Sequence, residues 1–121
     1  QPLWLIFSYI TVLVTVVSEV RETIIAHDSD IERAALALKA MSHPIRLKIL
    51  CAVAEDELSV QTIVDCVGTT QSNVSQHLAR LRDKEIVASR RDANRIFYRV
   101  KDERTLRLVE MMRDVFCSSE Q

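Results

Sequence analysis

The chain has 121 residues and 48% apolar residues, which is the size and composition of one compact domain with a hydrophobic core. These figures argue against a two-domain enzyme. A single Gly and two Pro leave few turn residues for an all-β fold, so we expect a mainly helical one. The formal net charge of −1 gives, taken whole, no indication of a polyanionic partner.

The charge is nevertheless unevenly distributed along the chain. Residues 1–69 carry 5 basic and 9 acidic side chains, residues 70–101 carry 8 and 3, and residues 102–121 carry 3 and 5. The middle segment therefore has a net charge of +5, and Ser, Gln and Asn lie between its basic residues. Such a block is typical of a nucleic-acid contact, although a mixed Lys/Arg surface on a solvated domain gives the same count.

The first 18 residues carry no charge and are mostly apolar. This length is at the lower limit for a membrane span, and the segment lacks the basic start and small-residue cleavage site of a secretion signal. Ser8, Thr11, Thr15 and Ser18 recur at steps of three and four, which favours a helix. We therefore expect a hydrophobic extension over residues 1–27. Three interpretations of its first 18 residues are open. They anchor the chain in a membrane, they pack against the domain or a dimer partner, or they are a non-native extension.

Helical spacing of apolar residues continues after this extension. It predicts a helix after Asp28, a second that begins at Pro44, a third capped by Ser59, a fourth capped by Thr70, and a last one from Asp102. Two β-prone runs, separated by a short polar segment, lie between the fourth and last helices. The predicted class is mainly α with a small β-hairpin (α+β), in the order ααααββα.

The third and fourth helices, joined by a turn at Gly68, form a helix-turn-helix candidate. Val74, Leu78 and Leu81 recur at helical spacing and should face the core. The opposite, polar face contains side chains suited to base edges, since Gln and Asn pair with adenine and Arg with guanine. An exposed helix with no such role would usually contain more Glu and Lys. The residues predicted to contact bases are Gln71, Ser72, Asn73, Ser75, Gln76 and Arg80.

Residues 86–90 and 96–100 predict a hairpin whose turn, 91–95, is cationic. Directly after a recognition helix, such a hairpin is a wing, and its basic residues are suited to phosphates or to a narrow minor groove. The start of the second helix offers further polar groups. The predicted wing and phosphate contacts are Ser42, Arg46, Arg90, Arg91, Asn94 and Arg95.

Three runs, at residues 38–47, 71–78 and 90–98, together resemble the ArsR family of winged-helix repressors in motif, order and spacing. The resemblance covers residues 28–118 and leaves 119–121 as a tail. It implies a cytoplasmic homodimer, formed through the first and last helices, that binds an imperfect inverted repeat in double-stranded DNA. It also implies release from DNA by an inducer.

The metal-sensing members of this family carry Cys-x-Cys after Glu-Leu in the third helix, or Asp and His pairs in the last helix. The corresponding run here is Glu57-Leu58-Ser59-Val60-Gln61, and the last helix contains no His. Ser and Gln are poor ligands for soft metals. We therefore expect neither a metal site nor a cofactor, and a metal-responsive repressor with a non-standard site is one alternative.

Cys51 and Cys117 match the positions of the two thiols in the haemolysin-regulator and biofilm-growth-repressor subgroup of the family. The resemblance implies that oxidant or reactive sulfur joins them by a disulfide or a polysulfide bridge. Without this resemblance, a small buried core residue is the preferred interpretation of Cys51. Cys66 has no counterpart and is expected to pack beside Val67, and His77 is expected to pack or to orient its neighbours.

The predicted function is thus a DNA-binding repressor whose operator affinity depends on a cysteine pair. A thiol enzyme would need a His beside a Cys, or a Cys-x-x-Cys, and the sequence offers no such spacing. We therefore expect no enzymatic activity. A membrane-tethered DNA-binding or interaction protein is the second alternative, because of residues 1–18.

Overall fold

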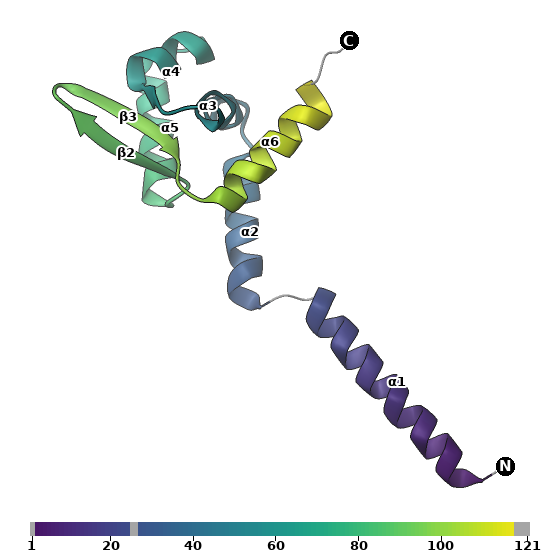
Figure 1. Ribbon diagram of the computed structural model, residues 1–121. Helices are drawn as coiled ribbons and strands as arrows, with labels where there is room; N and C mark the ends of the chain where they lie inside the picture. The colour runs from purple at the N-terminus through teal and green to yellow at the C-terminus, as the bar shows by residue number, and fades with distance from the viewer. Residues whose placement is uncertain (1, 25–26, 118–121) are drawn as a thin grey trace. The chain divides into compact units, whose positions relative to one another are not determined.

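The computed structural model describes residues 2–24 and 27–117, and the chain divides into two compact units, Gln1–Ala34 and Ala35–Gln121. The predicted order of four helices, a hairpin and a last helix is confirmed, with a short additional strand before the third of those helices (Figure 1). The predicted tail, 119–121, lies outside the described residues. The elements are α1 (Leu3–Ile24), α2 (Asp28–Ala40), α3 (Pro44–Ala54), β1 (Leu58–Ser59), α4 (Val60–Val67), α5 (Gln71–Asp83), β2 (Val87–Asp92), β3 (Arg95–Val100) and α6 (Glu103–Cys117).

The helix predicted for the hydrophobic extension is confirmed as α1, a single helix of 22 residues. Two of its hydroxyl groups bond to the backbone one turn earlier. Thr11 Oγ1 donates to the carbonyl oxygen of Phe7, and Thr15 Oγ1 donates to that of Thr11, both at 2.9 Å. Such bonds satisfy polar groups inside the helix itself.

Local capping residues fix the helix-turn-helix. Ser59 Oγ accepts a hydrogen bond from the backbone N–H of Thr62 at 3.3 Å, and Thr70 Oγ1 accepts one from that of Asn73 at 3.1 Å. Each cap satisfies a donor that the first turn of a helix otherwise leaves unpaired. Gly68 ends α4 in the left-handed conformation, with φ +81°, which glycine adopts at little cost.

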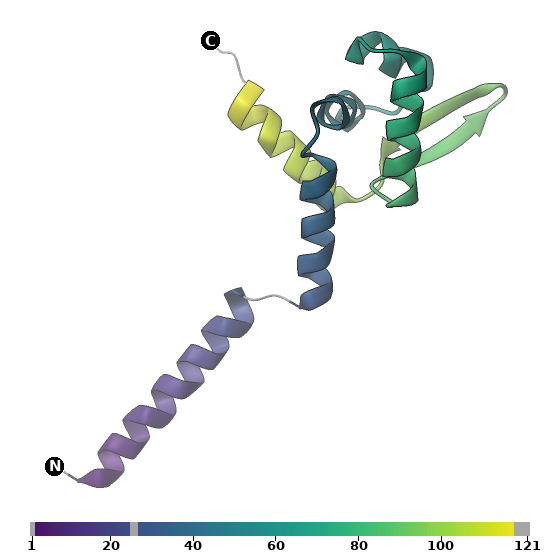
Figure 2. The same ribbon diagram turned by 180° about the vertical axis from the view of Figure 1, so that it is seen from behind.

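The core of the second unit lies around α3, which contacts α4, α5 and α6 (Figures 1 and 2). Ile49, Leu50, Ile63, Leu78 and Val109 are fully buried there. They come from α3, α4, α5 and α6, so one core positions both the helix-turn-helix and the last helix.

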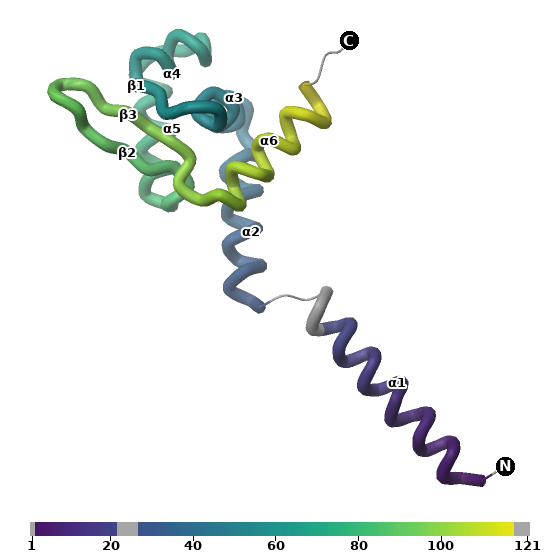
Figure 3. Tube along the Cα trace, in the orientation of Figure 1, coloured from purple at the N-terminus to yellow at the C-terminus, as the bar shows by residue number. Residues whose placement is uncertain are grey.

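The wing is part of a three-stranded antiparallel sheet in the order β1-β3-β2 (Figure 3). The turn predicted over 91–95 is shorter in the structure. Asp92 pairs with Arg95 across a two-residue turn, so Arg91, Asp92 and Arg95 belong to strands. The prediction was wrong here because Ala93 has a positive φ of 57°, which few residues other than Gly, Asn and Asp adopt, and which allows the tight turn.

Candidate nucleic-acid interface and thiol cavity

Five of the predicted base-contacting residues are exposed on α5, whereas Val74, Leu78 and Leu81 of the same helix are buried. We refer to these five as the recognition face. They present amide, hydroxyl and guanidinium groups, which hydrogen-bond to base edges in the major groove. The members of the recognition face are Gln71, Ser72, Ser75, Gln76 and Arg80.

The sixth predicted residue, Asn73, does not share this exposed position. It is half-buried, and its side-chain Nδ2 donates to Thr69 Oγ1 at 3.3 Å. Its backbone N–H is the group that Thr70 caps. Asn73 therefore stabilises the start of α5, and the prediction of base contact overlooked this because a helical wheel contains no information about the preceding turn.

A cavity of about 300 Å³ lies between the start of α5 and the wing. It brings Gln71 and Ser75 of the recognition face together with Asn94 and Arg95 of the wing. Residues that sequence analysis assigned separately to bases and to phosphates therefore form one continuous surface.

Two wing arginines are held by neighbouring side chains. The guanidinium of Arg90 lies 2.7 Å from Glu57 Oε1 and 4.7 Å from the centre of the Phe97 ring. That of Arg95 lies 5.2 Å from the same ring, and its Nη2 donates to Ser59 Oγ at 3.2 Å. The hydrogen bond that Arg90 donates to Glu57 raises the pKa of Arg90. Glu57 therefore competes with any phosphate for Arg90, whereas Arg91 is exposed on β2.

A second basic surface lies where α2, α3 and α5 meet. A cavity of about 210 Å³ there is lined by Arg46 and Arg80, together with Lys39 and Lys84. Arg46 Nε donates to the carbonyl oxygen of Ala40 at 3.0 Å, and its Nη2 to that of Lys39 at 3.2 Å, so it satisfies the end of α2.

Sequence analysis missed Lys39 and Lys84 because they join the cluster only through the packing of three helices. Ser42, the other predicted contact at this end of α3, is exposed and donates to the carbonyl oxygen of Lys39 at 2.7 Å. Its hydroxyl therefore already has a backbone acceptor.

His77 packs inside the domain, as predicted. It is buried, and its ring lies 4.8 Å from that of His43, the residue whose Nδ1 accepts the backbone N–H of Ile45 at the start of α3. Burial lowers the pKa of His77, and the nearby His43, Arg46 and Arg80 lower it further. His77 therefore packs α5 against the start of α3, and its burial favours the neutral form of the ring.

The two predicted switch cysteines face one large cavity of about 1040 Å³ between α3, α4 and α6, which we call the thiol cavity. Cys51 of α3 is half-buried, and Cys117 at the end of α6 is exposed. Most of the remaining lining is apolar, including Leu47, Met112 and Phe116.

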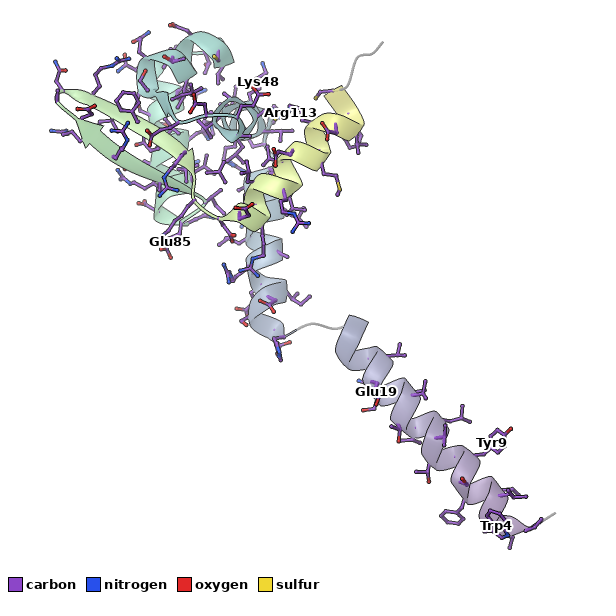
Figure 4. All side chains as sticks on the ribbon, in the orientation of Figure 1. Trp4, Tyr9, Glu19, Lys48, Glu85 and Arg113 are labelled. Atoms are coloured by element: carbon purple, nitrogen blue, oxygen red, sulfur yellow. The ribbon has the colours of Figure 1, made fainter. Side chains whose placement is uncertain are left out.

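Burial raises the pKa of the Cys51 thiol, and the charge of Cys117, which lines the same cavity, raises that pKa further. Arg113 opposes this effect. Its Nη1 lies 3.5 Å from the carbonyl oxygen of Cys51 and 3.2 Å from Glu55 Oε1. Figure 4 labels Arg113 of α6 and Lys48 of α3, both of which line the cavity.

The third cysteine, Cys66, does not pack beside Val67, and the prediction that it does was wrong. Its side chain is exposed and lines the thiol cavity from α4. The helical periodicity of α4 places Ile63 and Val67 in the core and leaves Cys66 on another side. Within residues 2–24 and 27–117, no three His, Cys, Asp or Glu side chains lie in positions to hold a metal ion.

A capped helix-turn-helix, a polar recognition face and a wing with arginines define a DNA-binding protein of the winged-helix class. Residues 43–89 match the model of the bacterial regulatory protein, arsR family. A curated relative, the biofilm growth-associated repressor of Xylella fastidiosa, is 35% identical over 111 residues, which are 87% of this chain and 97% of the relative. The chain belongs to the ArsR family of transcriptional regulators.

Solved structures support the same assignment. The chain resembles HlyU of Vibrio cholerae with a TM-score of 0.71 and 33% identity, over 75% of this chain and 99% of that one. It also resembles a winged helix-turn-helix DNA-binding domain, Mb0332 of Mycobacterium bovis, described as homodimeric, with a TM-score of 0.65 and 27% identity. That similarity covers 77% of this chain and 89% of the domain.

Proposed function

We propose that the protein is a homodimeric repressor that binds an inverted repeat in cytoplasmic DNA and leaves it when Cys51 and Cys117 become joined. The observation that carries this proposal is the position of both thiols on one cavity, close enough for the charge of Cys117 to raise the pKa of Cys51. An intracellular disulfide is more often a sensor than a structural bond.

The recognition face supports specific binding. In this proposal Gln71, Ser75 and Gln76 contact base edges, and Arg80 contacts a base or a phosphate. The wing residues Arg91, Asn94 and Arg95 contact the DNA backbone, as does Arg46 of α3, and Arg90 binds phosphate in competition with Glu57. Ser42 contacts a phosphate when its hydroxyl turns away from the carbonyl oxygen of Lys39.

Large apolar side chains on two helices support a homodimer. Leu38 of α2 is 53% exposed, and Phe116 of α6 is 78% exposed. Met111 and Val115 add to the apolar surface of α6. A second copy of the chain that pairs through α2 and α6 would bury these side chains, and an inverted repeat requires two recognition helices in one assembly.

The exposure of the two thiols suggests the order of the chemistry. Cys117 is exposed and meets the oxidant first, so a peroxide converts its thiolate to a sulfenic acid and releases the corresponding alcohol or water. The Cys51 sulfur then attacks this sulfur, the S–S bond forms, and the sulfenic oxygen leaves as water. A polysulfide donor such as a tetrasulfide reacts by exchange instead. The Cys117 thiolate attacks one of its sulfur atoms and expels a thiolate, and the Cys51 thiolate then attacks the sulfur chain on Cys117 and expels the remaining thiolate, so that the intervening sulfur atoms stay in the bridge.

The bridge joins α3 to α6, and α3 also packs against α5. A shift of α3 to accommodate the bridge moves Arg46 and the recognition helix, and therefore changes the spacing of two recognition helices in a dimer. Since specific binding exceeds non-specific binding by roughly 4–10 kcal/mol, a loss of a few kcal/mol empties the operator.

The test is binding of the reduced full chain to a fragment of its own promoter, measured by fluorescence anisotropy before and after treatment with hydrogen peroxide or tetrasulfide. We expect treatment to raise Kd by about 5- to 150-fold, the usual range of coupling between two sites. Cys51→Ser and Cys117→Ser should each abolish that rise and leave binding of the untreated protein unchanged.

Cys66→Ser is the matched control, because this thiol lines the same cavity from a different helix. It should keep the full response, and mass spectrometry of the treated protein should show Cys51 joined to Cys117. Release of DNA by treated Cys51→Ser or Cys117→Ser would overturn the proposed pair.

A further inference from the structure

The helix α1 has the length and surface of a membrane-spanning segment. Leu3–Arg21 has a mean hydropathy of 2.0, and no side chain of this stretch is buried within its own unit. These 19 residues form a helix about 28 Å long at 1.5 Å per residue, which is close to the hydrocarbon thickness of about 30 Å.

The apolar side chains of α1 cover most of the circumference of the helix, on every side except one stripe of Ser and Thr hydroxyls. Val12, Leu13 and Val14 follow one another at about 100° per residue, and each is more than half exposed. A protein partner covers one stripe of such a helix and leaves the remainder in water. A bilayer covers all of it, so lipid is the occupant that this surface fits.

The polar groups of α1 are compatible with lipid. Its backbone groups bond within the helix, as a lipid-exposed segment requires. The hydroxyls of Thr11 and Thr15 also bond to backbone carbonyls, so they do not need water.

The residues at the two ends of the segment suit the membrane surface. Trp4 lies near the first end (Figure 4), and tryptophan is enriched at the bilayer interface. Glu19 and Arg21 lie near the second end. Charged side chains are therefore confined to the end that leads to the winged-helix domain.

We propose that α1 spans the cell membrane and tethers the winged-helix domain at its cytoplasmic face. The orientation follows from DNA binding by the domain, and Arg21 and Arg33 on the same side agree with the preference for basic residues in the cytoplasm. The partner is the lipid bilayer itself.

The first test is fractionation of cells that contain the full chain, followed by flotation on a density gradient and an alkaline carbonate wash. We expect the protein to float with the membranes and to resist the wash. Flotation separates membrane protein from aggregate, which stays at the bottom. A chain recovered in the supernatant, as a monomer or as a dimer that buries α1, would overturn the proposal.

Paired substitutions test the depth of the helix in the bilayer. The double variant Val12→Arg/Leu13→Arg places two charges at the centre of the apolar stretch and should move the protein to the supernatant. The control variant Ser18→Arg/Val20→Arg also introduces two arginines, but near the C-terminal end of α1, where long basic side chains reach the headgroups. This variant should stay in the membrane. Equal behaviour of the two variants would contradict a spanning helix.

The orientation is tested with a membrane-impermeant maleimide, since Cys66 is exposed on the domain. The reagent should leave this residue unlabelled in intact spheroplasts and label it after lysis. Labelling before lysis would place the domain outside the cell and contradict the proposal.

Discussion

The surroundings of the recognition face and the thiol cavity differ in how they are built. Next to the recognition face, local hydrogen bonds fix the structure, such as the cap at Thr70 and the bond from Arg95 to Ser59. The thiol cavity is open space of about 1040 Å³, lined by side chains from three helices. DNA affinity is thus a sum of many contacts, whereas the proposed switch depends on a single covalent bond across this cavity.

The largest expected effect is on stability, and it comes from a substitution in the hydrophobic core that underlies both the recognition face and the thiol cavity. Leu78 is fully buried below the recognition face, in the core that also contains residues of α3 and α6. Leu78→Ala should reduce the free energy of unfolding by about 2–5 kcal/mol, because it removes buried methyl groups and leaves a cavity. Urea denaturation measures this loss, and Gln76→Ala, an exposed change on the same helix, should stay within about 0.5 kcal/mol of the parent.

Gln76→Ala should instead weaken DNA recognition and leave the chemistry of the thiol cavity unchanged. Loss of a base contact should cost about 1–3 kcal/mol of discrimination between the preferred operator and one altered at the contacted base pair. Competition binding with the two operators measures it. The rate at which peroxide joins Cys51 to Cys117 should not change, and a slower reaction would show that the two regions are not independent.

A smaller effect is expected at the wing. Glu57→Gln removes the carboxylate bound to Arg90 and should free this arginine for phosphate. The slope of log K against log salt should become steeper by about one unit for one additional phosphate contact. Adding Arg90→Ala to Glu57→Gln should remove the gain, and if the gain persists, Arg90 is not its source.

The smallest expected effect concerns the reactivity of Cys51. Burial and then Cys117 raise the pKa of Cys51, while Arg113 lowers it. Because the thiolate is the reactive form, Cys117→Ser should lower the pKa and shift alkylation of Cys51 to lower pH. Arg113→Gln should shift it to higher pH. Iodoacetamide labelling followed by mass spectrometry measures both, and shifts of the same sign would contradict the assigned neighbours.

The sequence predicts those parts of the fold that depend on neighbouring residues. Ser59, Gly68 and Thr70 act within three or four positions of themselves, so the start of α4 and of α5 and the turn between them were predicted correctly. The two-residue strand β1 escaped prediction because it exists only through pairing with β3, about forty positions later. The clustering of Lys39 with Lys84 likewise results from the packing of separate helices. The exposure of Cys66, by contrast, follows from the periodicity of α4, which the sequence prediction did not apply to this residue.

The pairing of β1 with β3 has a mechanical consequence. Ser59 is at once the last residue of β1, the cap of α4 and the acceptor of a hydrogen bond from Arg95. Ser59 therefore connects the wing to the helix-turn-helix, and the two should move as one rigid body. Each chain should then contact a DNA segment of fixed length. A change in the spacing between two half-sites has to be accommodated by movement of other parts of the protein.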